Sequence, residues 1–111
     1  MVLSQKQWSE AEKKAVWNKG TSVGNNDPAI WRQDMAGAWI NYNMYGNTND
    51  ELGYGWQIDH IKPQAEGGSD NIDNLQPLQW HNNNTKNDDY PHFYTSTTAS
   101  GTKNIKTSQY W

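Results

Sequence analysis

Residues 54–89 read YGWQIDHIKPQAEGGSDNIDNLQPLQWHNNNTKNDD, and this stretch decides the fold. The segment Trp56–Asp59 has the composition and pattern of a strand, and a second extended piece is expected near Leu75. A helix is predicted to start at Pro77 or Leu78 and to end near Asn87. Two strands followed by a helix are therefore expected in this part of the chain.

The same stretch concentrates polar groups that suit hydrolytic chemistry. Asp59 and His60 stand together at the end of the first strand, Asn74 lies in the connecting loop, and the run His81–Asn84 precedes Lys86. A histidine can accept a proton near neutral pH. Carboxylate and amide oxygens suit a hard cation such as Mg²⁺, and a lysine can hold a phosphate as a point charge. A base, a hard metal and a phosphate clamp are the parts that phosphodiester hydrolysis needs.

The order and spacing of these motifs resemble the HNH endonuclease family. The resemblance is carried by Asp59-His60-Ile61-Lys62-Pro63, Gly67-Gly68-Ser69-Asp70, Asn74-Leu75-Gln76-Pro77-Leu78, Asn83 and Lys86, and it is close over residues 54–89. It implies a ββα-metal fold, in which two antiparallel strands and a helix grip one divalent ion. Mg²⁺ is the first expectation for that ion, with Mn²⁺ or another divalent ion as alternatives.

The resemblance also implies a role for each matching residue. His60 is expected to be the general base that deprotonates the attacking water, and Asn74 is expected to hold His60 in orientation. Asp59 and Asn83 are the expected metal ligands. The residues expected to bind substrate are Lys86, Lys62 and Arg32.

The helix ligand has an alternative in His81. The spacing from Asn74 and to Lys86 selects Asn83. Residues 81 and 83 lie roughly 200° apart around a helix, so they cannot both face one ion. Lys86 follows Asn83 by three residues and shares its face, from which it is expected to reach a phosphate oxygen. His81 remains the second choice for this ligand.

The chain has no Cys, so it lacks the Cys-x-x-Cys pairs with which many members of the family bind a structural zinc. Gln79 and Asn82 occupy the aligned positions, and no structural zinc is expected. Packing of large side chains must then hold the fold, with Trp39, Trp56 and Trp80 as the expected substitutes.

Weaker signals predict the elements that precede this stretch. Ser9 and Glu12 have the spacing of a capping box that opens a helix, and Gly20 is expected to end that helix in a left-handed conformation. Asp27-Pro28 predicts a second short helix that runs to about Met35. Residues 38–42 predict a strand.

Composition sets the overall class. Only 33% of the 111 residues are hydrophobic, and the mean hydropathy is −1.11, but seven Trp and a net charge of only −3 argue against disorder. An α+β fold is expected, a small ββα-metal (HNH) domain with additional N-terminal helices. Residues 1–94 are expected to form this single domain. Residues 95–111 are expected to be a polar, partly mobile tail, pinned at its end by Tyr110 and Trp111.

The expected function is that of a metal-dependent HNH endonuclease that nicks or cuts DNA, with RNA left open as a substrate. Two alternatives remain: a catalytically weak or inactive nucleic-acid-binding module of the same fold, and a nuclease toxin neutralised by an inhibitor protein. The pI of about 5.4 counts against a large basic nucleic-acid surface, so any nucleic-acid contact is expected to be local. No run of residues is apolar enough for a membrane span, and residues 1–6 are too polar for a secretory signal, so a cytoplasmic location is expected. The oligomeric state is left open.

Overall fold

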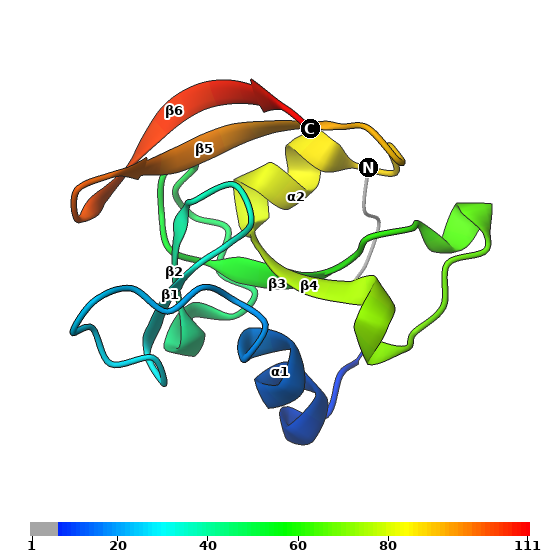
Figure 1. Cartoon of the computed structure of the whole chain (residues 1–111), viewed down its shortest axis with the longest axis horizontal. Coiled ribbons are helices and arrows are strands. Elements are labelled where there is room, and N and C mark those ends of the chain that lie inside the picture. The colour runs from blue at the N-terminus through cyan, green and yellow to red at the C-terminus, as the bar shows by residue number, and fades with distance from the viewer. Residues whose placement is uncertain (1–6) are drawn as a thin grey trace.

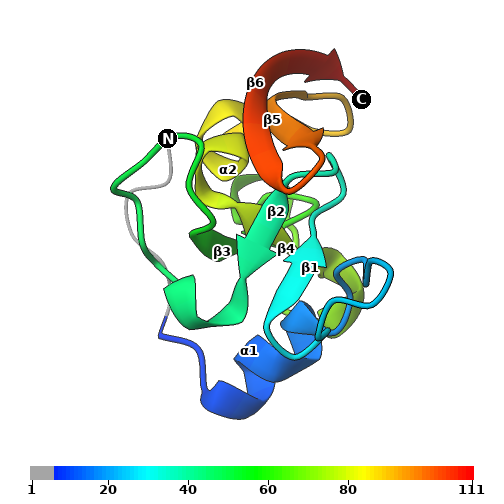
Figure 2. The same cartoon turned by 90° about the vertical axis from the view of Figure 1, so that its left-hand side faces the viewer.

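The structure is a computed structural model that describes residues 7–111, and it has an α+β fold built from two helices and three antiparallel strand pairs (Figures 1 and 2). The helices are α1 (Glu10–Trp17) and α2 (Trp80–Lys86). The strand pairs are β1 (Trp31–Gln33) with β2 (Trp39–Asn41), β3 (Trp56–His60) with β4 (Leu75–Gln79), and β5 (Tyr94–Ser100) with β6 (Lys103–Tyr110). The expected fold class is confirmed. The N-terminal residues 1–6, whose polarity argued against a secretory signal, lie outside the described residues.

The β3–β4 hairpin forms the middle layer, with α1 on one face and α2 on the other (Figures 1 and 2). Its register places Asp59 opposite Gln76 and His60 opposite Leu75. Strand β3 was expected at 56–59, and β4 extends the short piece expected near Leu75 as far as Gln79. The order β3, β4, α2 is the two-strand and helix arrangement that the motif spacing predicted.

Helix α2 starts at Trp80, two to three residues later than expected. Pro77 and Leu78 remain paired with β3, and the Gln79 side chain caps the helix by accepting from the backbone N–H groups of His81 and Asn82. A glutamine is not among the usual capping residues, so the sequence at Gln79 gives only a weak signal for a helix start. The helix ends at Lys86, close to the expected position.

Helix α1 confirms the predicted capping box. The Ser9 hydroxyl accepts from the Glu12 N–H, and the Glu12 carboxylate accepts from the Ser9 N–H. The left-handed end expected at Gly20 is wrong, because the helix closes at Asn18 in a right-handed conformation and Gly20 does not have a positive φ.

The short helix expected from Asp27-Pro28 to about Met35 is also wrong. Asp27 does cap one turn, since its carboxylate accepts from the Ala29 N–H. Beyond that turn the chain becomes β1, because Gln33 pairs with Trp39 of β2 on one side and with Thr21 on the other. Tertiary pairing therefore overrides the local turn signal. The strand expected at residues 38–42 is present as β2.

A core of aromatic and aliphatic side chains fills the space between α1 and the β3–β4 hairpin. The Trp17 and Trp56 rings lie 5.1 Å apart and are almost fully buried. The cluster comprises Trp8, Val16, Trp17, Ile40, Trp56, Ile58 and Leu75. Of the three tryptophans expected to replace a zinc site, Trp56 and Trp39 are buried and Trp80 is half-buried.

The two positions aligned with the absent Cys-x-x-Cys pair hold a buried network of hydrogen bonds, here called the Asp34 network and made of Asp34, Gln79 and Asn82. The Asp34 carboxylate accepts from the Gln79 backbone N–H at 2.9 Å and from Asn82 Nδ2 at 3.0 Å. Asn82 Oδ1 in turn accepts from the N–H groups of Ser96 and Thr97. The network thus joins the β1–β2 turn, α2 and β5, in addition to the expected tryptophans.

Residues 94–110 form the β5–β6 hairpin. No strand was expected here, because the sequence of residues 95–111 predicted only a polar tail. Strand β5 packs on α2, and Thr95 and Thr97 are buried there. The end is held as expected, because Trp111 pairs its backbone with Phe93 and donates its indole N–H to Thr95 Oγ1. No helix in the described part of the chain has the length and apolar character needed to cross a bilayer.

Candidate active site

Strand β3 carries the two central candidates on opposite faces. Side chains alternate along a strand, so Gln57 and Asp59 face α2, while Ile58 and His60 face α1. The contacts agree: Lys86 of α2 reaches Asp59, and the Trp8 ring lies 5.9 Å from the His60 ring. His60 is the last residue of β3, so its ring lies at the end of the hairpin rather than at its middle.

Asp59 is buried, and its carboxylate is paired with the ammonium group of Lys86. Lys86 Nζ donates to Asp59 Oδ1 at 3.2 Å and to the His60 carbonyl at 3.1 Å, and Gln76 Nε2 donates to Asp59 Oδ2 at 2.9 Å. Burial raises the pKa of the Asp59 carboxyl, and the positive charge of Lys86 and the bond from Gln76 oppose that rise.

The structure corrects the expectation that Lys86 reaches out to a phosphate. Its side chain is fully buried, with Nζ also 5.3 Å from the centre of the Phe93 ring. The helical spacing correctly placed Lys86 on the face of Asn83, but that face points into the protein, where Asp59 is the anion that meets the ammonium group.

Asn83 lies at the same interface between β3 and α2. Its Nδ2 donates to Gln57 Oε1 at 2.8 Å, which fixes the orientation of the amide. Its Oδ1 is buried and has no hydrogen-bond partner within the described residues. A buried oxygen without a hydrogen-bond donor is costly, and a water molecule or a bound cation would satisfy it.

His81, the alternative ligand, is directed elsewhere. Its Nδ1 lies 2.8 Å from Ser96 Oγ on β5, and its Nε2 lies 3.4 Å from a Glu51 carboxylate oxygen. The structure therefore brings Asn83, and not His81, to the interface that holds Asp59.

His60 contacts a carboxylate that was not assigned a role. Its Nε2 lies 2.7 Å from Asp70 Oδ1, and its side chain is 18% exposed. Asn74, which was expected to orient His60, makes its three side-chain hydrogen bonds to the backbone of Lys62 and Ser69. Asn74 thus shapes the loop, and Asp70 is the group that touches the imidazole.

The two remaining cationic candidates differ in their surroundings. Lys62 is exposed and lies two residues beyond His60, where its ammonium group is accessible to a polyanion. Arg32 instead donates to the carbonyl groups of Asn18, Gly20 and Pro28, and these bonds tie the end of α1 to β1. The structure does not bring Arg32 to Asp59 or His60.

The side-chain oxygens of Asp59 and Asn83 at the β3–α2 interface are of the chemical kind that binds a hard divalent ion. Asp59 offers a carboxylate, and Asn83 offers an amide oxygen that lacks a donor. Mg²⁺ is commonly held by one or two protein oxygens together with water and phosphate. Within residues 7–111 no three His, Cys, Asp or Glu side chains form a metal-binding group.

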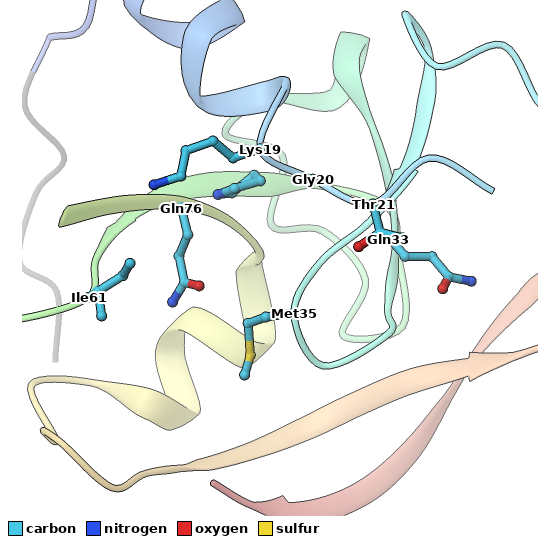
Figure 3. A pocket seen from close by; sticks show the side chains of 8 residues that line it. Lys19, Gly20, Thr21, Gln33, Met35, Ile61 and Gln76 are labelled. Carbon is cyan, nitrogen blue, oxygen red and sulfur yellow. The ribbon is translucent and has the colours of Figure 1, made fainter. Parts of the chain in front are cut away.

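A cavity of about 160 Å³ lies beside β4 and adjoins the site through one residue. Gln76, Met35 and Lys19 are among the residues that line it (Figure 3). Gln76 also donates to Asp59, so its amide separates the cavity from the carboxylate. The cavity is smaller than the roughly 300–1,000 Å³ of ordinary ligand pockets, and it does not contain Asp59 or His60.

Sequence reasoning missed Gln57, Gln76 and Asp70. A signal existed for Gln57, because it stands two residues before Asp59 and therefore shares its face of the strand. The contact of Gln76 with Asp59 depends on the register of β3 and β4. The contact of Asp70 with His60 depends on the path of a long loop.

Comparison with known proteins supports the resemblance. Residues 46–89 match the family model described as HNH endonuclease. No curated protein and no solved structure matches the chain. The match covers β3, β4 and α2 together with Asp59, His60, Asn74 and Asn83. Residues 46–89 of this chain are therefore similar to the HNH endonuclease family, without the cysteine pairs of many members.

Proposed function

We propose that this protein is a metal-dependent endonuclease that hydrolyses phosphodiester bonds in DNA. The observation that carries the proposal is the unpartnered, buried Oδ1 of Asn83, which stands at the same strand–helix interface as the Asp59 carboxylate within a segment that matches the HNH family. Such an oxygen is expected where a cation is to be bound.

His60 is the proposed general base. Its Nε2 faces Asp70, and its Nδ1 has no hydrogen-bond partner within the described residues, so Nδ1 is the atom proposed to take the proton of the attacking water. The partly exposed ring at the end of β3 is reachable by a phosphate backbone. Exposed Lys62, close in sequence, is proposed to bind a neighbouring phosphate.

Asp59 and Asn83 are the proposed metal ligands. A divalent ion held there supplies charge to stabilise the scissile phosphate and the leaving 3′ oxygen. Gln57 and Gln76 orient the two ligands through the hydrogen bonds described above. For Asp59 to bind such an ion, Lys86 must withdraw from Oδ1 or share the carboxylate with it, since its ammonium group now lies against that oxygen.

The position of Lys86 also favours a second candidate, an inactive binding module of the same fold. A buried ammonium group satisfies the charge of Asp59 without any metal. In that case the protein would bind nucleic acid through exposed groups such as Lys62 and would not cleave it. Divalent ions would then not bind at Asp59, and their addition would not change the affinity for nucleic acid.

Cleavage of supercoiled plasmid in Mg²⁺ or Mn²⁺ tests the proposal, with an RNA of matched length as the comparison substrate. The wild type is expected to cut or nick DNA, and His60→Ala and Asn83→Ala are expected to lose that activity. His92→Ala is the matched control, because His92 is an exposed histidine near the C-terminal end. Equal cleavage by wild type and His60→Ala would overturn the proposal. Gel shifts at low salt that reveal binding without any cleavage would support the inactive module instead.

A further inference from the structure

The loop between β3 and β4 is closed on itself by one side chain. Asn74 Oδ1 accepts from the Lys62 N–H at 2.8 Å, and Asn74 Nδ2 donates to the carbonyl groups of Lys62 at 3.0 Å and Ser69 at 2.8 Å. The Asn74 carbonyl accepts from the Ile61 N–H. The start of the loop, its later part and its end are therefore joined at Asn74.

Two glycines allow the loop to fold back tightly. Gly67 has a left-handed backbone, with φ of 89°. At Gly68 a Cβ atom would lie 1.7 Å from the Lys62 carbonyl oxygen, a distance that no side chain can tolerate. The Gly68 N–H also donates to the Pro63 carbonyl. The Gly67-Gly68 pair thus permits a close return of the chain, which carries the following residues back toward the end of β3.

The group delivered by this return is the Asp70 carboxylate. Its Oδ1 lies 2.7 Å from His60 Nε2, and Gln64 Nε2 donates to the same oxygen at 3.3 Å. An ionised carboxylate only accepts hydrogen bonds, so a neutral His60 must carry its proton on Nε2 in this contact. Nδ1 then keeps its lone pair.

We propose that Asp70 is the positioning residue of His60, and that it holds the imidazole with the proton on Nε2 so that Nδ1 is the basic nitrogen. Asn74 acts one step further away, by shaping the loop that carries Asp70. The catalytic meaning of this contact rests on the proposed endonuclease function, whereas the contact and the tautomer do not.

The tautomer of His60 is the primary measurement. Ring ¹⁵N and ¹³C correlations of the wild type, recorded at alkaline pH where the ring carries one proton, are expected to show protonated Nε2 and unprotonated Nδ1. Asp70→Ala is expected to give a mixture of tautomers. Asp70→Asn keeps an acceptor oxygen, which the Gln64 amide helps to orient, and is expected to keep the wild-type tautomer. Asp73→Ala removes another exposed carboxylate of the same loop and is the control.

Plasmid cleavage supplies the second measurement. Asp70→Ala is expected to lower kcat by about tenfold or more, part of the roughly 10²–10⁴-fold that a positioned base contributes, with KM changed less than twofold. Asp70→Asn is expected to recover most of that loss, and Asp73→Ala to behave like the wild type. A wild-type ring with its proton on Nδ1, or an unchanged tautomer in Asp70→Ala, would refute the positioning role. If neither the wild type nor any variant cleaves DNA but the tautomers follow this pattern, the positioning role of Asp70 holds and the endonuclease function fails.

Discussion

Lys86 Nζ lies 3.2 Å from Asp59 Oδ1, and both side chains are buried, at 0% and 5% exposure. The pair joins α2 to β3 at the position where the family resemblance expects a metal ligand. Removal of two charges from water is costly, and only their mutual attraction and the bonds from Gln76 and to the His60 carbonyl compensate for it. The ammonium group therefore serves as the cation of Asp59 in this structure.

Substitution of Lys86 is expected to destabilise the protein, because Asp59 loses its cation. Lys86→Met leaves a buried carboxylate without a cation, and the free energy of unfolding is expected to fall by about 3–5 kcal/mol in urea titrations. Mn²⁺ or Mg²⁺ is expected to raise the melting temperature of Lys86→Met more than that of the wild type, because the freed carboxylate and Asn83 Oδ1 can then share an ion.

Lys103→Met is the matched control for this variant, because Lys103 is exposed at the start of β6. It is expected to change the stability by less than about 0.5 kcal/mol. A Lys86→Met protein that is as stable as the wild type and indifferent to both ions would contradict the view of Lys86 as the cation of a latent metal site.

The sequence predicted the elements whose signals are local. The Ser9–Glu12 capping box and the strand at 56–59 need only nearby residues, and both are present in the structure. The segments at 31–33 and 94–110 have weak local patterns and become strands because partners distant in sequence pair with them. Their pairing could not be read from their own residues.

The candidate site divides in the same way. Helical spacing correctly placed Asn83 and Lys86 on one face, but it could not tell that this face is buried against Asp59. The order of motifs made His60 and Asn74 candidates, whereas the contact of Asp70 with His60 depends on how a loop of more than ten residues closes. Contacts across such a loop follow from its tertiary structure.

Asn82 is expected to matter more for stability than its exposed neighbour Asn84 on α2. Its amide donates to Asp34 and to the Thr97 carbonyl and accepts from two backbone N–H groups of β5. Asn82→Ala removes the side-chain partner of the Thr97 carbonyl and of the Ser96 and Thr97 N–H groups, at about 1–3 kcal/mol each, while Asp34 keeps its three backbone donors. Asn84→Ala, an exposed change on the same helix, is the control and is expected to be nearly neutral. Denaturant titrations of the two variants measure the difference, and equal midpoints would contradict it.

Asp34 is expected to make stability depend on pH. Burial raises the pKa of its carboxyl to about 6, although four N–H donors, including those of Ala36 and Ala38, oppose the rise. The unfolded chain has a value of about 3.9, so the folded state binds the proton more tightly between these values. The resulting stabilisation is complete below about pH 4 and is lost as the pH rises through about 6, a change of about 3 kcal/mol.

The side-chain ¹³C shift of Asp34 measures this directly, and a midpoint near 6 is expected. Asp34→Asn is expected to be less stable than the wild type, because its NH₂ group faces backbone N–H donors, and to lack this part of the pH dependence. A midpoint near 4 in the wild type would show that the four donors outweigh burial.

Gln57 is expected to control the orientation of Asn83. Its Oε1 accepts from Asn83 Nδ2, and this bond leaves Asn83 Oδ1 as the buried oxygen without a donor. Gln57→Leu removes the acceptor, so the Asn83 amide can turn, and the affinity for Mn²⁺ in calorimetry is expected to fall by about 10- to 100-fold, the usual effect of losing a partner that orients a ligand. Gln64→Leu removes a glutamine from the far side of β3, beside Asp70, and is expected to leave the affinity unchanged. Unchanged Mn²⁺ affinity in Gln57→Leu, with binding still abolished by Asn83→Ala, would show that Asn83 holds its orientation without Gln57.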